Sequence, residues 1–507
     1  MAIKRYVASI DNTITNAFES NLTTRGTGSN MGAADSLEIF SLYGQVSASS
    51  GQSSELSRAL IKFPVSASAA GVTSIREDRV AEKIPASGSV KFYLKMYNAE
   101  HPFTLARDFR LDIYPASSSW EEGFGLDMEE YKDITYNSTG SNWSRASEAA
   151  AWVTASGGGD YRTGYNFTAS FPKGWEDVDV EITPLVERWM QQSGTTNHFN
   201  NYGLLLKLAD TQESASISYY TKKFFARSTE FFFRRPVIEA RWDSRTTDER
   251  GAFYYSSSLA PAADNLNTIY LYNYVRGSLT NIPNSSSVAT TGSILVSVYS
   301  GSTTPAGAKL LLPAGGGVVT AEHTNITGGW VSTGIYSASF ALTAAATSLT
   351  KVFDVWHDGT TQYYTSSVAP LKLSAYNNAP TFDYITATTN LKSQYSRKED
   401  ARFRFFTRQR NWNPNIYNVA SATTSNETVA SASYKIVRLT DELEVIAYGT
   451  GSNRETYLSH DVSGNYFDLD MALLEADYAY GIKLTYYNSS IKSWVEQPEM
   501  FKFRVEE

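Results

Sequence analysis

The sequence predicts an all-β protein made of tandem β-sandwiches. Segments that alternate apolar and polar residues recur along the chain between clusters of Gly, Ser, Asn and Pro, which is typical of half-buried strands. The chain holds 33 Tyr, 25 Phe and 10 Trp, and aromatic residues favour strands because they fit a pleated surface. Its 507 residues exceed one core, since domains hold about 100–200 residues. We therefore expect a jelly-roll-like N-terminal sandwich with one short helix, followed by two immunoglobulin-like sandwiches.

The N-terminal sandwich is expected over residues 1–245. Its clearest alternating segments are residues 36–44, 89–97 and 104–114. Residues 181–192 break this alternation, because helical spacing there relates Ile182, Leu185, Val186 and Trp189. A threonine N-cap at Thr183, followed by proline, favours a helix start. This pattern predicts the one short helix, lying across the sandwich.

The two immunoglobulin-like sandwiches are expected over residues 246–376 and 377–507. Charge, Gly and Pro replace the alternation at residues 241–265, and a second break lies at residues 374–383. Between these breaks, alternating segments recur about every ten residues, the spacing expected of a sandwich. An Asp358-Gly359 pair predicts a hairpin turn near the end of the second domain.

Composition excludes several classes of partner. The net charge is −8 and the pI is about 5.4, so the protein's overall field repels nucleic acid and anionic membrane surfaces. No run approaches about 18 apolar residues, so no membrane span is expected. The opening residues lack the apolar run of roughly 7–15 residues of a secretory signal peptide, so none is expected either. Cysteine is absent, which removes disulfides and thiolate chemistry.

The sequence offers few candidates for catalysis. The five histidines are scattered over the three predicted domains, at His101, His198, His323, His357 and His460. One acidic segment, residues 120–133, could supply a glycosidase pair or a calcium loop from Glu121, Glu122, Asp127, Glu129, Glu130 and Asp133. Carboxylates on one loop rarely flank a glycosidic bond from both sides, and the calcium-loop spacing is missing. We expect a solvated acidic loop, no enzymatic activity and no cofactor.

Aromatic residues raise the question of binding surfaces. Four tryptophans of the first domain are considered as platforms for a host surface glycan: Trp120, Trp143, Trp175 and Trp189. Trp143 lies in a polar segment and is the candidate for glycan contact, whereas Trp189 is expected in the core. The run Phe231, Phe232 and Phe233 cannot face one side of a strand. At least one of these rings is therefore expected to be exposed or covered by a partner, which indicates an interface.

A second candidate interface is the segment 401–412. Its arginines Arg402, Arg404, Arg408 and Arg410 stand at even intervals. Because side chains alternate along a strand, they are expected on one face, with Phe403 and Phe405 on the other. Such a face could meet an acidic neighbouring subunit, and an ordinary solvated face is the alternative.

The order of the motifs in residues 1–243 resembles the DNRLRE-type β-sandwich. The resemblance rests on these stretches: DNTITNAF from Asp11, SNMGAADSLEIF with Asn30 and Gly32, SRALIKFPV from Ser57, a Trp-x-Glu-Gly turn at Trp120, a helix-like segment 183–190, NYGLLLKL from Asn201 and RRPVIEARW from Arg234. In that family a strand like residues 58–63 is central, and the fold is similar to that of carbohydrate-binding modules. The resemblance implies no catalysis.

The second half of the chain is similar to uncharacterised virion structural proteins of marine contractile-tailed bacteriophages. The stretches that carry this resemblance are residues 392–420 and 463–507. It implies a virion protein that assembles in the host cytoplasm as a homo-oligomer with other virion proteins at the neck, collar or tail. A capsid decoration protein and a glycan-binding host-adhesion protein are the alternatives.

Overall fold

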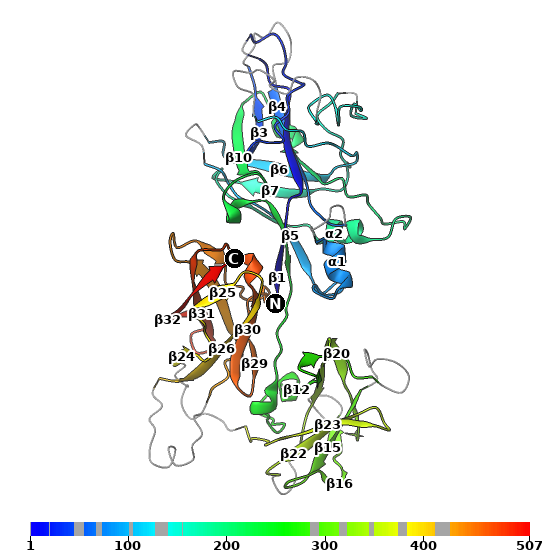
Figure 1. Ribbon diagram of the computed structural model, residues 1–507, viewed down its shortest axis with the longest axis vertical. Helices are drawn as coiled ribbons and strands as arrows, with labels where there is room; N and C mark the ends of the chain where they lie inside the picture. The colour runs from blue at the N-terminus through cyan, green and yellow to red at the C-terminus, as the bar shows by residue number, and fades with distance from the viewer. Residues whose placement is uncertain are drawn as a thin grey trace. The chain divides into compact units, whose positions relative to one another are not determined.

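The computed structural model describes residues 2–19, 21–44, 55–66, 73–100, 105–126, 140–154, 156–283, 294–313, 322–343, 349–373, 383–410 and 426–507. They form two compact units, Ala2–Asp243 and Ser244–Glu507. Both units consist mainly of antiparallel sheets (Figure 1). The predicted all-β fold of tandem sandwiches is confirmed. The domain limits 1–245, 246–376 and 377–507 stay predictions.

The unit Ala2–Asp243 is built on two sheets. The four-stranded sheet has the order β1 (Ile3–Val7), β11 (Val237–Arg241), β5 (Lys91–Met96) and β8 (Val178–Glu181). The seven-stranded sheet has the order β10 (Tyr219–Phe225), β3 (Ser36–Leu42), β4 (Glu55–Lys62), β9 (Leu204–Leu208), β6 (Phe109–Pro115) and β7 (Phe167–Phe171), with β2 (Ile10–Thr15) paired to β4. One core contains residues of both sheets, for example Ile61 and Leu206 with Phe92 and Ile238. This is a sandwich.

The seven-stranded sheet is buried on its second face as well. Strand alternation places Leu60 of β4 and Leu205 of β9 on the face opposite to Ile61 and Leu206. There they form a smaller core with Ile14 and with Trp120, Trp143 and Trp152, which come from the long connection between β6 and β7. Two-sided burial explains why the five residues of β9, LLLKL, are all buried.

Three short α-helices occur in the described part of this unit, where the sequence predicted one. The predicted helix is α2 (Thr183–Met190), which buries Leu185, Val186 and Trp189. Its N-cap is Ile182, and Thr183 instead accepts a hydrogen bond from the amide of Phe92 at 2.9 Å. The helices α1 (Ile75–Val80) and α3 (Asp210–Glu213) were missed. They are too short for a helical period to emerge, although the Ser74–Glu77 capping box of α1 was a readable signal.

The unit Ser244–Glu507 has two groups of strand ladders. The first group contains a three-stranded sheet with the order β12 (Asn267–Tyr272), β21 (Ile335–Phe340) and β20 (Gly329–Ser332). Its five-stranded sheet has the order β16 (Ala306–Lys309), β15 (Leu295–Ser300), β22 (Val352–His357) and β23 (Gln362–Val368), with β19 (Ile326–Thr327) paired to β15. Two two-stranded sheets complete it: β13 (Tyr274–Val275) with β14 (Ser278–Leu279), and β17 (Leu312–Pro313) with β18 (Glu322–His323). Its core contains Trp356 and Tyr336. The predicted Asp358-Gly359 turn joins β22 to β23, and Gly359 has a φ of 102°.

The second group contains two further sheets. One is β24 (Tyr384–Thr388), β26 (Asp400–Gln409), β30 (Gly464–Asp470) and β29 (Ser459–Asp461); the other is β25 (Gln394–Ser396), β32 (Ser493–Glu506), β31 (Ala479–Asn488), β27 (Ala432–Arg438) and β28 (Glu444–Ile446). Aromatic rings fill the space between them, since Phe403 of β26 lies 5.4 Å from Phe503 of β32, and Phe467 of β30 stacks on Tyr434 of β27 at 3.7 Å. The β25–β32 pair is parallel.

Candidate functional site

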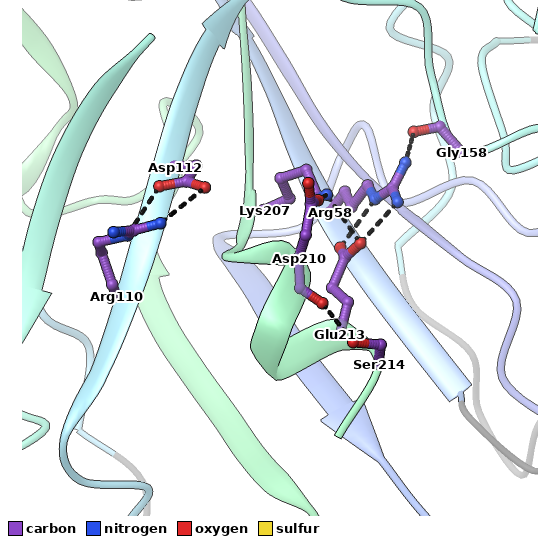
Figure 2. A network of polar contacts seen from close by, with 8 residues as sticks. All are labelled: Arg58, Arg110, Asp112, Gly158, Lys207, Asp210, Glu213 and Ser214. Carbon is purple, nitrogen blue, oxygen red and sulfur yellow. Dashed lines mark hydrogen bonds and ion pairs between the residues drawn. The ribbon is translucent and has the colours of Figure 1, made fainter. Parts of the chain in front are cut away.

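A cluster of charged side chains lies on the outer face of the seven-stranded sheet, beside the tryptophan core. We call Arg58, Asp112, Lys207, Asp210 and Glu213 the charged cluster (Figure 2). Arg58, Asp112 and Lys207 come from β4, β6 and β9, and Asp112 lies directly opposite Lys207 in the ladder. Alternation puts these three on the face opposite to the main core. The helix α3 begins two residues after the end of β9 and brings Glu213 to Arg58 and Lys207, and Asp210 to Lys207. Asp112 pairs with Arg110.

Glu213 is the centre of the charged cluster. Its two carboxylate oxygens accept hydrogen bonds from Arg58 Nε and Nη2 at 3.0 and 2.8 Å, a bidentate arrangement. Its Oε2 atom also lies 2.9 Å from Lys207 Nζ, which forms a second ion pair with Asp210. Arg58 Nη1 donates to the carbonyl oxygen of Gly158 at 2.7 Å. Figure 2 shows these bonds joining α3 and the segment at Gly158 to the sheet.

Burial and charge act against each other in this cluster. Arg58 is 9% exposed and Lys207 only 1%. Burial alone would lower the pKa of Lys207, but the carboxylates of Glu213 and Asp210 outweigh it and the net effect raises that pKa. The hydrogen bond from Lys207 in turn lowers the pKa of Asp210. Both shifts favour the charged forms of Lys207 and Asp210, and the geometry of the cluster suits the anchoring of α3 to the sheet.

A second polar group surrounds Asp11 at the start of β2. Glu122 accepts two hydrogen bonds from the Arg227 guanidinium, both at 2.6 Å, and one from the Asp11 amide at 2.9 Å. Burial, aided by the Glu122 carboxylate, raises the pKa of Asp11 to about 7, although the hydrogen bond from the Arg227 amide and the charge of Arg227 both act to lower it. Gly123 has a φ of 77°, and a Cβ there would lie 2.4 Å from the Asn30 amide oxygen. The glycine of the Trp-x-Glu-Gly turn is thus required.

This second group corrects the expectation of a solvated acidic loop at residues 120–133 for Glu122, whereas Glu121 is exposed as expected. The Glu122 side chain is only 15% exposed and is neutralised by Arg227. Four of the acidic residues considered there lie outside the described residues: Asp127, Glu129, Glu130 and Asp133.

The candidate glycan contact Trp143 is buried, so the expectation that it is exposed was wrong. It is 8% exposed, packs in the tryptophan core, and lies under the Arg58 guanidinium, 5.1 Å from its ring centroid. The polar residues around it suggested a surface loop, but this loop folds back onto the sheet. Trp120 and Trp189 are buried as well, whereas Trp175 is 56% exposed. Sequence reasoning weighed Trp175 without singling it out.

The Phe231–Phe233 run forms a turn and not a strand. Residues Phe232–Arg234 make a single 3-10 turn, with both phenylalanines half-buried. Phe231 is 54% exposed and meets the ring of Phe225 edge-on at 5.6 Å. One exposed ring in this run was expected, and the interface it was taken to indicate stays a prediction.

The predicted alternation of the arginine segment is confirmed in β26. Phe403 and Phe405 are fully buried, and the arginines at 402, 404 and 408 lie on the other face. Two of them already have acidic partners within the chain: Arg402 binds Asp468 at 2.7 and 3.0 Å, and Arg404 binds Asp461 at 2.6 and 2.9 Å. The acidic neighbour foreseen for these two is thus the adjacent part of the same chain. Arg408 is the next-to-last residue of β26, and Arg410 follows the strand.

One serine–histidine contact occurs on the outer face of the β15–β22 ladder. The Ser297 hydroxyl lies 2.7 Å from His357 Nε2 and donates to Asn325 Oδ1 at 2.7 Å. His357 Nδ1 accepts the Gly359 amide proton at 3.0 Å, so the proton of the neutral ring sits on Nε2. Burial lowers the pKa of His357, which favours that neutral ring. In this arrangement the histidine donates to the serine and does not act as its general base.

Two further findings apply to the described residues. None of their His, Asp and Glu side chains gather in threes in a way that could hold a metal ion. None of their helices is long and apolar enough to cross a membrane.

Comparison with known proteins adds little. No protein-family model matches the chain, and no curated protein matches it. Among solved structures, Salmonella alpha-2-macroglobulin reacted with methylamine aligns with 92% of this chain at 8% identity and a TM-score of 0.15. This chain spans 26% of that protein's length. A TM-score this low carries no conclusion about fold or function.

Proposed function

We propose that this chain is a non-enzymatic structural protein of a tailed-bacteriophage virion, assembled through β-sandwich contacts at the neck, collar or tail. The observation that carries the proposal is that charged side chains which could bind a ligand are paired with one another inside the chain. The buried Arg58 and Lys207 both pair with Glu213, Lys207 also pairs with Asp210, and Arg404 pairs with Asp461. Groups held in this way stabilise a scaffold, and a scaffold is what a particle component must provide.

The sequence supports the same proposal. The second half of the chain resembles virion proteins of contractile-tailed bacteriophages, and the first half resembles a non-catalytic sandwich. The absence of cysteine suits assembly in the reducing cytoplasm of a host. The partners are then further copies of this chain and other virion proteins, each contact burying more than about 1,000 Å².

Cryo-electron microscopy of the particle tests the proposal through the position and copy number of the chain. A ring of about five to twelve copies at the neck or tail would support it, because oligomers of this kind close with cyclic symmetry. Hundreds of copies on the capsid would favour the decoration protein. A position at the tip of a fibre would favour the glycan-binding adhesin, which loses Trp143 as its contact residue. A particle without the chain would refute all three.

A further inference from the structure

Lys222 of β10 is a buried amine whose hydrogen-bond acceptors carry no charge. Its side chain is 1% exposed. The Nζ atom donates to Asn98 Oδ1 at 2.6 Å and to the carbonyl oxygens of Gly174 and Glu176, both at 2.9 Å. An ammonium group has three donors, and these acceptors are neutral oxygen atoms. The nitrogen is therefore held in place by groups that would bind a neutral amine as well.

The surroundings of Lys222 favour its neutral form. Its Nζ atom lies 4.9 Å from the ring centroids of Phe171 and Phe224. Burial lowers the pKa of Lys222 to about 8, although the charges of Asp177 and Glu176 act to raise it. With such a pKa, part of the lysine is a neutral amine at neutral pH. A neutral lysine in an apolar site is a nucleophile.

Lys207 shows how carboxylate partners change such an amine. It is buried to the same extent, at 1% exposed, but it forms ion pairs with Glu213 and Asp210. Their charges outweigh burial and raise the pKa of Lys207, so its nitrogen stays protonated and has no lone pair with which to attack. Lys207 and Lys222 differ in their acceptors and not in their burial, and this difference assigns the reactive amine to Lys222.

The amide group that faces Lys222 comes from the other sheet. Asn98 lies two residues beyond β5 of the four-stranded sheet. Both of its neighbours are bound to β10 by backbone hydrogen bonds of 3.1 Å, in which the Ala99 amide donates and the Tyr97 carbonyl oxygen accepts. The Asn98 carbon Cγ is bonded to the oxygen that already contacts Nζ, so rotation of the amide group turns this carbon toward the amine. Reacting groups held in this way need little further ordering.

We infer that Lys222 and Asn98 react to form an intramolecular isopeptide bond, an amide between Nζ of the lysine and Cγ of the asparagine. The Asp177 carboxylate, which accepts the backbone amide proton of Asn98 at 2.7 Å, takes a proton from Nζ. The lone pair set free forms the N–C bond, and Asp177 passes the proton to Oδ1. The C–Nδ2 bond breaks as the carbonyl group re-forms, and Nδ2 leaves as an ammonium ion.

This reaction balances without an oxidant, a reductant or a cofactor. One lysine ammonium group and one primary amide give one secondary amide and one ammonium ion, so the charge of Lys222 leaves with the ion. The product replaces a buried charge by a neutral amide, which removes the cost of burying that charge. It also links β10 to the end of β5 across 124 positions of sequence, and so restricts the unfolded chain as a disulfide does. The bond requires neither a virion nor a second copy of the chain.

Mass spectrometry of the purified, denatured full-length chain tests the bond. Wild type is expected to be lighter than its sequence by one ammonia molecule, and a tryptic digest to contain a branched peptide that joins Asn98 to Lys222. Lys222→Arg keeps the positive charge but cannot form the amide, so it is expected at its full mass. The matched control is Lys223→Arg, at the next lysine, which is half-buried and pairs with Glu38; it should keep the mass loss. Asp177→Asn should slow the reaction and leave a larger unreacted fraction.

Three results would overturn the inference. They are a folded wild-type chain that keeps its full mass through prolonged incubation, an equal mass loss in Lys222→Arg, and a loss of ammonia without the branched peptide, which would indicate a succinimide instead. The wild-type mass decides by itself, so the test does not depend on the folding of any variant. Equal reaction rates of wild type and Asp177→Asn would overturn the role given to Asp177.

Discussion

Arg58 and Glu213 are joined by two hydrogen bonds of 3.0 and 2.8 Å although 155 positions separate them in the sequence. The pair links the centre of the seven-stranded sheet to α3, a helix of four residues. So short a helix has no stability of its own. The ion pair therefore anchors α3 to the sheet, as a buried hydrophobic face anchors a longer helix.

Glu213→Gln is expected to destabilise the first unit strongly. It leaves Arg58 and Lys207 buried without their shared carboxylate, and breaking a buried pair costs about 3–5 kcal/mol. Urea unfolding followed by tryptophan fluorescence measures the loss, since Trp143 lies next to Arg58. Glu181→Gln is the control, because it removes a pair with Lys91 whose side chains are 40% and 63% exposed and should cost under about 1 kcal/mol. Similar losses in both variants would contradict the structural role of the cluster.

Trp143→Ala and Trp175→Ala are expected to differ strongly in their effect on the free energy of unfolding. Truncating the buried Trp143 should cost about 3–5 kcal/mol through a cavity in the tryptophan core. Truncating the exposed Trp175 should change the free energy of unfolding by less than about 0.5 kcal/mol. Thermal unfolding of both variants tests this contrast, and a large loss in Trp175→Ala would show that its ring is part of the fold.

Asp11→Asn is expected to abolish one component of the pH dependence of stability. The pKa of Asp11 is raised to about 7 in the folded chain, so the folded state keeps a proton that the unfolded state loses near pH 3.8. Between these values the free energy of unfolding falls as pH rises. The Asp11→Asn variant should lack this slope, and its free energy of unfolding at about pH 8 should exceed that of wild type by roughly 2–4 kcal/mol.

Urea midpoints measured across this pH range test the Asp11 prediction. Glu148→Gln, a change at an exposed carboxyl, is the control and should keep the wild-type slope. An Asp11→Asn variant that loses stability at high pH would mean that the carboxylate is ionised and paired in the fold.

Alternation carried most of what could be predicted. Successive side chains of a strand point to opposite faces, so the sequence alone shows which of them share a face. The alternation therefore placed Phe403 and Arg402 on opposite faces of β26 correctly. It failed for Trp143, because a polar sequence around a tryptophan says nothing about a loop that folds back over a sheet. Whether a sheet has one buried face or two depends on residues more than fifty positions away, and no local pattern contains that.

The charged cluster could not be predicted for the same reason. The segment Leu204–Leu208 contains Lys207, and a lysine in an apolar run predicts an exposed edge more readily than a buried ion pair. Its partner Glu213 lies on α3, which has too few residues to show a helical period. The hydrogen bonds of the buried Lys222 were equally hidden, since two of its three acceptors are the backbone carbonyl oxygens of Gly174 and Glu176, and every sequence has such groups.

His460→Gln is expected to remove an acid sensitivity of the second unit. His460 lies in β29 and holds the segment at Thr246 and Asp248 by backbone hydrogen bonds of 2.9 and 3.0 Å. Burial, aided by Arg245, lowers the pKa of His460 to about 4 from its ordinary 6.5. Between these values the unfolded chain binds more protons, so the free energy of unfolding is highest above pH 6.5 and falls as pH drops toward 4.

On acidification toward pH 4, the free energy of unfolding of wild type should fall by roughly 2–3 kcal/mol because of His460. The His460→Gln variant should lack this part of the pH dependence. Urea unfolding of the full chain at about pH 5 and pH 7.5 measures it. His198→Gln, in the other unit, is the control and leaves the second unit's transition unchanged. Equal losses of stability for wild type and His460→Gln on acidification would contradict the prediction. They would mean that the His460 ring is protonated in the folded chain as readily as in the unfolded chain, and that the segment at Thr246 does not bury it.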